Sequence, residues 1–412
     1  MSRWVVVASL VVACGDNGDG PHFDGFVQVD LVGVQGIEYT APLAIGDHTF
    51  QVQVDTGSTT TAVASSACSS CEVSPTYTAG SGAADQHATA SQSYADATGW
   101  SGEVFADAAS IGDSPDVRLK FAAISQQTNF FGGNVDQGIL GLGPAELLQP
   151  NTTSFAAQEF AAGVDPVMAF ELCTDHGTFS IGGFDPAIAD GDPVFTPMLA
   201  LSNDNPYFDV QLAGLGLGSA SFGSASDLGV TIVDTGTTLT LLPSAAETAL
   251  VDAINANAGY LSLFGDQQPI ADGQCVVASD VTAAMVDAAM PPLQLALAGT
   301  AQTVTLPASR SYLFEKTAGE FCLAMSDIGT IGGPATGLSL IGDTLMSGAV
   351  TVFDVGAKRI GFAPEVGCAT GSAAGSAADW PARPPGTPWW TNAPGFHAPA
   401  WPRLTAAARA GT

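Results

Sequence analysis

The feature that most constrains this chain of 412 residues is a short segment that occurs twice. Residues 52–58 read VQVDTGS, and residues 231–237 read TIVDTGT. Each copy is followed at a distance by two bulky apolar residues and a glycine, at 139–141 and at 340–342. Because the Asp-Thr-Gly segment and the apolar-apolar-Gly segment both occur twice, we predict two similar halves that face each other, each contributing one aspartate.

The rest of the chain reads as an all-β protein of two domains. Short runs rich in Val, Ile, Thr and Phe, broken by Gly, Asn, Asp and Pro, extend from Phe26 to about Pro364. The length suits two domains of ordinary size. We therefore predict an N-terminal β lobe over residues 26–198 and a C-terminal β lobe over residues 199–368. Helices are expected only at 145–148, 153–162 and 244–257.

The two ends of the chain differ from this pattern. Residues 1–14 combine an early positive charge with an apolar stretch too short for a permanent bilayer span, which predicts an export signal. The signal ends in Val-Val-Ala-Cys14, which resembles a bacterial lipobox with Cys14 as the lipidated residue. An ordinary signal peptide with an incidental cysteine is the alternative. Residues 15–25 predict a flexible acidic tether, and residues 369–412 a disordered or loosely packed tail.

These ends predict an exported protein, either a cell-envelope lipoprotein or a periplasmic or extracellular one. A membrane contact is expected only through the lipid anchor. The chain carries 40 acidic residues against 10 basic ones, a net charge of −30. Such a surface repels nucleic acid and anionic membranes, so neither is an expected partner. Adaptation to salt and adaptation to acid both remain open as explanations of this charge.

Six cysteines remain once Cys14 is set aside, and an even number in an exported chain favours disulfides. Cys68 and Cys71 have the spacing of a zinc knuckle, but no second pair of cysteines or histidines completes four ligands. The same spacing occurs in redox motifs, although no βαβ pattern surrounds it. A structural bridge is the favoured interpretation, and neither a metal nor a cofactor is expected.

A single Asp-Thr-Gly is typical of an ordinary turn. Two copies that both follow a β-branched strand and both precede a hydroxyl residue indicate a catalytic pair, Asp55 and Asp234. Two carboxylates within hydrogen-bond reach cannot both ionise cheaply, so they share one proton at mildly acidic pH. The charged member can take a proton from a water, while the neutral member donates a hydrogen bond to a scissile carbonyl.

Six neighbours are expected to support the two carboxylates: Thr56, Gly57 and Ser58 in the first copy, and Thr235, Gly236 and Thr237 in the second. The glycines let the backbone pass close to the carboxylates. The threonines that follow the aspartates can hydrogen-bond across the lobe interface. The last residue of each copy can donate to the outer carboxylate oxygen.

These motifs resemble the pepsin-like aspartic proteases over roughly residues 38–368. The stretches that carry the resemblance are 55–58, 136–143, 179–185, 232–239, 340–343, 350–354 and 359–364. The resemblance implies a bilobal β fold with a cleft between the lobes. It also implies an aspartic endopeptidase that hydrolyses polypeptides at acidic pH without a covalent intermediate, as a monomer. With the lipobox, it suggests a bacterial-type member with some plant-branch features.

The family covers its cleft with a hairpin flap that carries a tyrosine. Tyr94 lies 39 residues after the first aspartate, a spacing similar to the plant branch of the family, and is the predicted flap residue. A plain surface hairpin is the alternative. Ala95 and Ala97 replace glycines of the plant-branch flap and stiffen the hairpin. The tryptophan that normally partners this tyrosine is missing, because residues 59–62 read TTTA; Trp100 is a candidate replacement.

The resemblance also implies the disulfide pairing: Cys68–Cys71, Cys275–Cys322 and Cys173–Cys368. Apolar and hydroxyl residues near the motifs are candidates to line substrate pockets, although they could equally be simple core: Phe130, Phe131, Ile139, Ile232 and Thr238. Gln53 places a polar group where relatives often have an apolar one.

Three alternatives compete with the protease assignment. A catalytically inactive binding protein on the pepsin fold would usually lose one aspartate, and a surface lipoprotein would need neither. A glycosidase with paired carboxylates usually presents aromatic platforms, whereas the tryptophans here gather in the tail. Many family members also carry a basic pro-segment, but no Lys or Arg lies between Arg3 and Arg118. We therefore expect activity as soon as the folded chain meets acid.

Overall fold

The structure is a computed structural model that describes residues 25–34, 38–95, 97–131, 136–202, 205–331, 333 and 337–369. The predicted signal segment with Cys14, nearly all of the tether and nearly all of the tail lie outside the described residues. The described part contains no helix that is long and apolar enough to cross a membrane.

The fold is mostly β, as predicted. The strands of the first half are β1 (Val27–Gly33), β2 (Tyr39–Ile45), β3 (His48–Asp55), β4 (Ala62–Ala64), β5 (Ala84–Ser93), β6 (Gly99–Ile111), β7 (Val117–Thr128), β8 (Gly138–Gly141), β9 (Val167–Leu172), β10 (His176–Ile181) and β11 (Val194–Pro197). Those of the second half are β12 (Asp209–Leu217), β13 (Ala220–Ser224), β14 (Val230–Val233), β15 (Thr240–Leu242), β16 (Cys275–Val277), β17 (Leu293–Leu297), β18 (Thr303–Leu306), β19 (Leu313–Thr317), β20 (Glu320–Leu323), β21 (Met325–Asp327), β22 (Leu338–Ile341), β23 (Ala349–Asp354) and β24 (Arg359–Pro364).

The helices are short. They are α1 (Phe155–Ala161), α2 (Ala225–Leu228), α3 (Ser244–Asn255), α4 (Ala258–Phe264), α5 (Ala283–Ala289) and α6 (Asp343–Met346), with 3-10 turns η1 (Ala145–Leu147), η2 (Pro186–Ile188), η3 (Ala308–Arg310), η4 (Ile328–Ile331) and η5 (Gly367–Ala369). The three segments predicted as helical correspond to η1, α1 and α3. The helices α2, α4, α5 and α6 were not predicted. Of these, α4 starts directly after α3, where the Asn257 side chain accepts a hydrogen bond from the Gly259 N–H.

Strand pairing joins the two halves of the chain through one sheet. The largest sheet has the order β11-β24-β23-β9-β10-β1-β2-β3-β8-β4-β7-β6-β5. Its β23 and β24 come from the second half, yet β23 pairs with β9 of the first. The division into lobes at residues 198 and 199 stays a prediction. A second sheet (β18-β17-β12-β14-β22-β15-β21, with β13 on β12) and a small third sheet (β16-β20-β19) belong to the second half.

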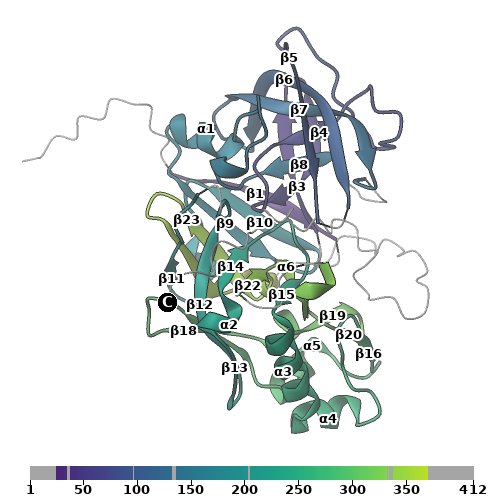
Figure 1. The fold of residues 1–412 in the computed structure, drawn as a ribbon, viewed down its shortest axis with the longest axis vertical. Coiled ribbons are helices and arrows are strands. Elements are labelled where there is room, and N and C mark those ends of the chain that lie inside the picture. Colours follow the sequence, from purple (N-terminus) through teal and green to yellow (C-terminus); the bar gives the residue numbers. More distant parts are fainter. Residues whose placement is uncertain are drawn as a thin grey trace, which may run out of the picture.

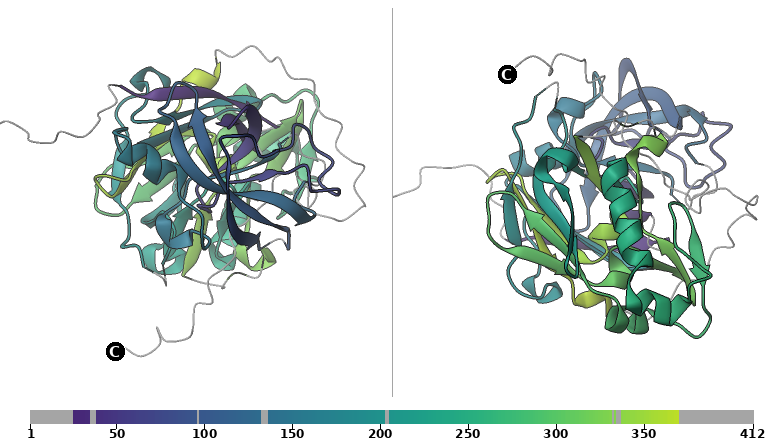
Figure 2. Two further views of the ribbon diagram at one scale, coloured as in Figure 1. Left: turned by 90° about the horizontal axis from the view of Figure 1, so that it is seen from above. Right: turned by 60° about the horizontal axis from the view of Figure 1, so that its bottom comes forward.

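Strands β5, β6 and β7 lie at one end of the molecule, and α3 and α4 lie at the other (Figure 1). Figure 2 shows the same separation from a second direction, with the long helix α3 on the side of the second half. The repeated sequence motifs lie between these ends. In both halves the strand that ends near the aspartate runs parallel to the strand that carries the apolar-apolar pair.

The internal repeat therefore corresponds to a repeated structure. β8 lies between β3 and β4, parallel to the first and antiparallel to the second. β22 lies in the same way between β14 and β15. Both central strands are completely buried, which explains why they read as short apolar runs without alternation.

The three predicted disulfides are all present: Cys68–Cys71, Cys173–Cys368 and Cys275–Cys322. The bridge between Cys173 and Cys368 ties the end of the described chain to the turn after β9, across 195 residues. The zinc and redox interpretations of the first pair are thereby replaced by a bridge, as favoured from the sequence.

Candidate active site

Asp55 and Asp234 are held by backbone hydrogen bonds to the strands that carry the apolar pairs. The Leu142 N–H donates to the Asp55 carbonyl at 2.7 Å, and the Asp234 N–H donates to the Ile341 carbonyl at 3.0 Å. Both side chains are buried, with 1% and 0% of their surface exposed. These hydrogen bonds fix the backbone position of each aspartate.

Thr56 and Thr235 lock the two loops together. The Thr56 hydroxyl donates to the Val233 carbonyl at 3.0 Å, and the Thr235 hydroxyl donates to the Val54 carbonyl at 2.9 Å. Each hydroxyl also accepts the backbone N–H of the other threonine, at 3.0 Å and 3.1 Å. This reciprocal set of four bonds, the cross-loop threonine pair, is the interaction that the sequence predicted. It leaves little freedom for one carboxyl group to move relative to the other.

Each carboxyl group receives hydrogen bonds from its own loop. Asp55 Oδ1 accepts the N–H of Gly57 at 2.7 Å and of Ser58 at 3.1 Å, and the Ser58 hydroxyl donates to its Oδ2. Asp234 Oδ1 accepts the Gly236 N–H at 2.8 Å. The Thr237 hydroxyl donates to Asp234 Oδ2 at 2.7 Å, so both outer oxygens have the hydroxyl partner that was predicted.

The two glycines are required because each loop passes close to the opposite carboxyl group. A Cβ atom at Gly57 would lie 2.5 Å from both carboxyl oxygens of Asp234. A Cβ atom at Gly236 would collide with the carboxyl group of Asp55. Real Cβ atoms do not approach so closely, so any side chain at either position would push the carboxyl groups apart.

Burial raises the pKa of both aspartates. For Asp55 burial is the largest cause, followed by the negative charge of Asp234, and its pKa lies well above the usual value. For Asp234 burial is again the largest cause, but hydrogen bonds from Thr237, Gly236 and Asp55 oppose it. The pair therefore keeps one shared proton to a higher pH than an isolated aspartate would. A carboxylic acid hydrogen-bonded to a carboxylate can act as acid and base at once.

A cavity of about 280 Å³ opens beside the pair, and Asp55, Gly57, Ser58 and Tyr94 contribute to its walls. Tyr94, the predicted flap residue, thus lines the same cavity as Asp55. The Trp100 indole N–H donates to the Tyr94 hydroxyl at 3.1 Å, and the Phe130 ring stacks on the Tyr94 ring at 5.9 Å. Trp100 therefore supplies the indole partner that the missing tryptophan would provide.

The remaining walls of this cavity were not found from the sequence. They come from Gln92 on β5, from the segment around η1, and from Tyr207, which precedes β12. Tyr207 is buried, and burial followed by the charges of Asp234 and Asp55 raises its pKa, so its hydroxyl stays protonated. No spacing links these segments, because they meet only in the folded chain.

The predicted subsite residues lie in the interior. Phe130, Ile139 and Thr238 have no exposed surface, whereas Ile232 and Phe131 are 3% and 6% exposed. Phe130, Phe131 and Ile139 pack in one apolar cluster with Tyr94 and Trp100 beneath the flap. None of the five lines the cavity beside Asp55. Gln53, on β3, is likewise buried.

Three further carboxyl groups are buried near the pair: those of Glu38, Asp136 and Asp343. They were not predicted from the sequence. Burial, then the charge of Asp136 and a hydrogen bond with it, raise the pKa of Glu38 well above its usual value. Burial, then the charges of Asp234, Glu38 and Asp55, raise the pKa of Asp343. Neither carboxyl oxygen of Asp343 meets a hydrogen-bond partner among the described residues.

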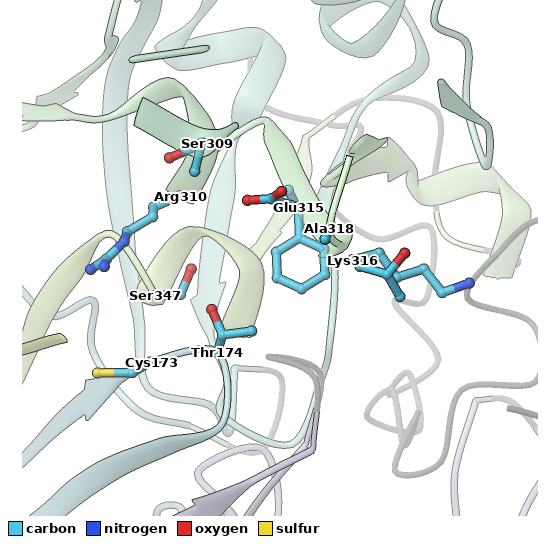
Figure 3. A pocket seen from close by; sticks show the side chains of 11 residues that line it. Cys173, Thr174, Ser309, Arg310, Glu315, Lys316, Ala318 and Ser347 are labelled. Carbon is cyan, nitrogen blue, oxygen red and sulfur yellow. The ribbon is translucent and has the colours of Figure 1, made fainter. Parts of the chain in front are cut away.

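A second cavity, of about 360 Å³, lies away from both aspartates, between η3, β19 and the turn at Cys173 (Figure 3). Its two basic side chains, Arg310 and Lys316, extend in opposite directions in that view, and Arg310 pairs with Glu365. They do not converge on one ligand. Two groups of Cys and Glu side chains elsewhere have metal-like spacing, but their sulfurs form the Cys173–Cys368 and Cys275–Cys322 disulfides.

Two buried aspartates on paired, interlocked loops are the arrangement that the sequence predicted for an aspartic protease site. Residues 38–365 match the family described as eukaryotic aspartyl protease, and the chain belongs to this family of pepsin-like aspartic proteases. An aspartic protease of Phaffia rhodozyma is 31% identical, over 81% of this chain and 78% of that protein. Aspergillopepsin-1 of Aspergillus oryzae is 28% identical, over 80% and 79%.

A plant relative covers less of the chain. Aspartyl protease family protein 2 of Arabidopsis thaliana is 29% identical over 56% of this chain and 46% of that protein. These relatives are fungal and plant proteins, so they support the family but not the bacterial-type origin that the lipobox-like segment suggested. The fold, the family and the aspartic endopeptidase activity were correctly predicted from the sequence.

Proposed function

We propose that Asp55 and Asp234 are the catalytic residues of an acid-active endopeptidase that hydrolyses polypeptides with a water bound between the two carboxyl groups. The observation that carries this proposal is the four-bond threonine pair, which holds the two buried carboxyl groups on facing loops. A binding protein would not need such tight mutual positioning of two acids. Positioning of reacting groups is a large contribution to catalysis.

The chemistry follows from the shared proton. Asp234 accepts a proton from the water, which attacks the peptide carbonyl carbon, while Asp55 donates its proton toward the carbonyl oxygen. The resulting tetrahedral species breaks when Asp234 passes the proton taken from the water to the peptide nitrogen, one hydroxyl of the tetrahedral carbon returns a proton to Asp55, and the C–N bond cleaves. Tyr94 covers the site and helps to exclude bulk water. The hydrogen bonds from Ser58 and Thr237 hold the outer oxygen of each carboxyl group in position.

The pH dependence follows from the raised pKa of Asp55. The proton on the pair is present at acidic pH and is lost as pH rises through that raised value. Activity should therefore be greatest at acidic pH and decline toward neutral pH. An enzyme that is fully active at pH 8 and inactive at pH 4 would contradict the shared-proton mechanism.

The test is a pair of substitutions, Asp55→Asn and Asp234→Asn. Each keeps the shape of the side chain but removes one acid, so each should reduce cleavage of a denatured protein substrate to below a few per cent of the wild-type rate. Circular dichroism should show an unchanged fold. If either variant retains substantial activity, the catalytic assignment is wrong. If the wild type cleaves nothing at any pH, the protein is instead an inactive binding protein or surface lipoprotein on this fold.

We further propose that the protein is exported and acts as a monomer, anchored through lipid on Cys14. The three disulfides support an oxidising compartment. Expression of the full chain in a lipoprotein-processing bacterium with labelled palmitate should label the wild type but not Cys14→Ser. Cleavage at another site without labelling would favour an ordinary signal peptide.

A further inference from the structure

The cavity beside Asp55 is lined by a group of aromatic and apolar residues and by a group of polar and acidic residues. Tyr94 and Tyr207 contribute buried aromatic walls, and Leu147 and Leu148 contribute half-buried apolar ones. Its volume of about 280 Å³ is below the range of roughly 300–1,000 Å³ that is typical of pockets for whole small molecules. Since it adjoins a catalytic carboxyl group, it is sized for one side chain of a bound polypeptide close to the scissile bond.

The polar group, which we call the rim, consists of Gln92, Glu146 and Gln149. Glu146, an exposed residue of η1, brings a carboxyl group to it. Gln92 and Gln149 add two amides, and the Gln149 side-chain N–H donates to the Gln92 side-chain oxygen at 2.6 Å. This bond joins β5 to the segment after η1 and holds the two amides at the rim. No described residue that lines the cavity is basic.

These walls discriminate among substrate side chains. A large apolar side chain would cover the glutamate and the two amides without giving them hydrogen bonds, which is costly. An acidic side chain would meet the like charges of Glu146 and the catalytic pair. Lysine and arginine have an apolar stem and a cationic end, so the stem can lie along the aromatic and leucine walls while the cation reaches the rim.

We propose that this cavity binds a lysine or arginine side chain of the substrate, with Glu146 as the partner of its cation. The inference rests on the proposed endopeptidase function and names its substrate preference. The net charge of −30 attracts basic polypeptides in general, but only Glu146 makes the preference depend on one position of the substrate.

The experiment uses the full-length enzyme and one quenched fluorescent peptide that it cleaves. Each of the three positions on either side of the scissile bond is changed in turn to lysine, to methionine, which is a neutral chain of similar length, or to glutamate. At pH 5 and low ionic strength, one position should show kcat/KM about three- to tenfold higher for lysine than for methionine, with glutamate lowest. The ratio should fall as salt is added.

Two variants and a control identify the residue. Glu146→Gln should bring the lysine-to-methionine ratio at that position close to one, and Glu146→Lys should make glutamate the preferred residue there. Glu103→Gln, at an exposed glutamate on β6 that lines a different cavity without either catalytic aspartate, should keep the wild-type ratio.

The outcomes separate the two proposals. Peptides that are cleaved with no position preferring lysine, or a preference that survives in Glu146→Gln, would overturn the role of Glu146 and leave the endopeptidase function intact. An enzyme that cleaves none of the peptides and no protein substrate would overturn the endopeptidase function and this inference together.

Discussion

Glu38→Gln should change how the stability of the fold depends on pH. Glu38 precedes β2, has no exposed surface, and is paired with Asp136, which precedes β8. Burial first, and the charge of Asp136 second, raise its pKa well above the ordinary 4.5. The unfolded chain therefore releases this proton at a lower pH than the folded protein does. The contribution to stability is complete below the ordinary pKa and is lost as pH rises toward the raised one.

The size of the effect follows from this linkage. Each pH unit over which the folded protein keeps a proton that the unfolded chain has lost removes about 1.4 kcal/mol of unfolding free energy. Between pH 5 and pH 7 the loss reaches up to about 2.7 kcal/mol. Glutamine has the same shape, cannot ionise, and can donate an amide N–H to Asp136. The variant should therefore lack this loss and become more stable than the wild type at pH 7.

Urea denaturation at pH 4, 5, 6 and 7, followed by tryptophan fluorescence, measures the effect. The wild-type free energy of unfolding should fall with pH more steeply than that of Glu38→Gln, with the two curves converging near pH 4. Glu103→Gln, which removes an exposed carboxyl group, should run parallel to the wild type. If Glu38→Gln and the wild type lose stability at the same rate between pH 5 and pH 7, the Glu38–Asp136 pair does not hold its proton and the reasoning fails.

Three further outcomes follow from the site and the bridges. Thr56→Ala should lower kcat and cost about 1–3 kcal/mol of stability, because it leaves the Thr235 N–H unpaired in the interior, while Thr56→Ser should recover most of both in the same kinetic and urea measurements. Trp100→Phe removes the donor to the Tyr94 hydroxyl, worth about 0.5–1.5 kcal/mol, so kcat/KM should fall by up to about tenfold; an unchanged value would show that the flap does not depend on this bond. Replacing Cys173 and Cys368 by serine should lower stability by about 2–5 kcal/mol, and far more than the same change at Cys68 and Cys71, since the loops closed span 195 and 3 residues.

The hydrogen bonds around Asp55 and Asp234 were predictable from the sequence because they are made by neighbours within the repeated motif. Gly57 is required by the close approach of Asp234, and this requirement leaves the same residue in both copies of the motif. The presence of disulfides was predictable from the even number of cysteines, whereas the pairing of the cysteines came from the family resemblance. The motifs around the two aspartates and the cysteines can both be recognised from the types of residue that they contain.

The walls of the cavity could not be predicted in this way. Gln92, Glu146 and Tyr207 come from segments that are far apart in the sequence, and each would be unremarkable on an exposed strand or turn. Glu38 was missed for the opposite reason: a glutamate at the start of a strand normally faces solvent, and only the packing around β8 shows that it is buried with a second acid. Tertiary contacts, and not local preference, give these residues their roles.

The buried acids give activity and stability the same dependence on pH through different groups. In the proposed mechanism, catalysis ends when Asp55 loses its proton as pH rises, while deprotonation of Glu38 and Asp343 destabilises the fold. Since all three pKa values are raised by burial, the protonated, folded form is favoured in acid. The two effects are separable, because Glu38→Gln should gain stability at pH 7 without gaining activity there. A Glu38→Gln variant that also gained activity at pH 7 would show that unfolding, and not the protonation of Asp55, limits the wild-type enzyme at neutral pH.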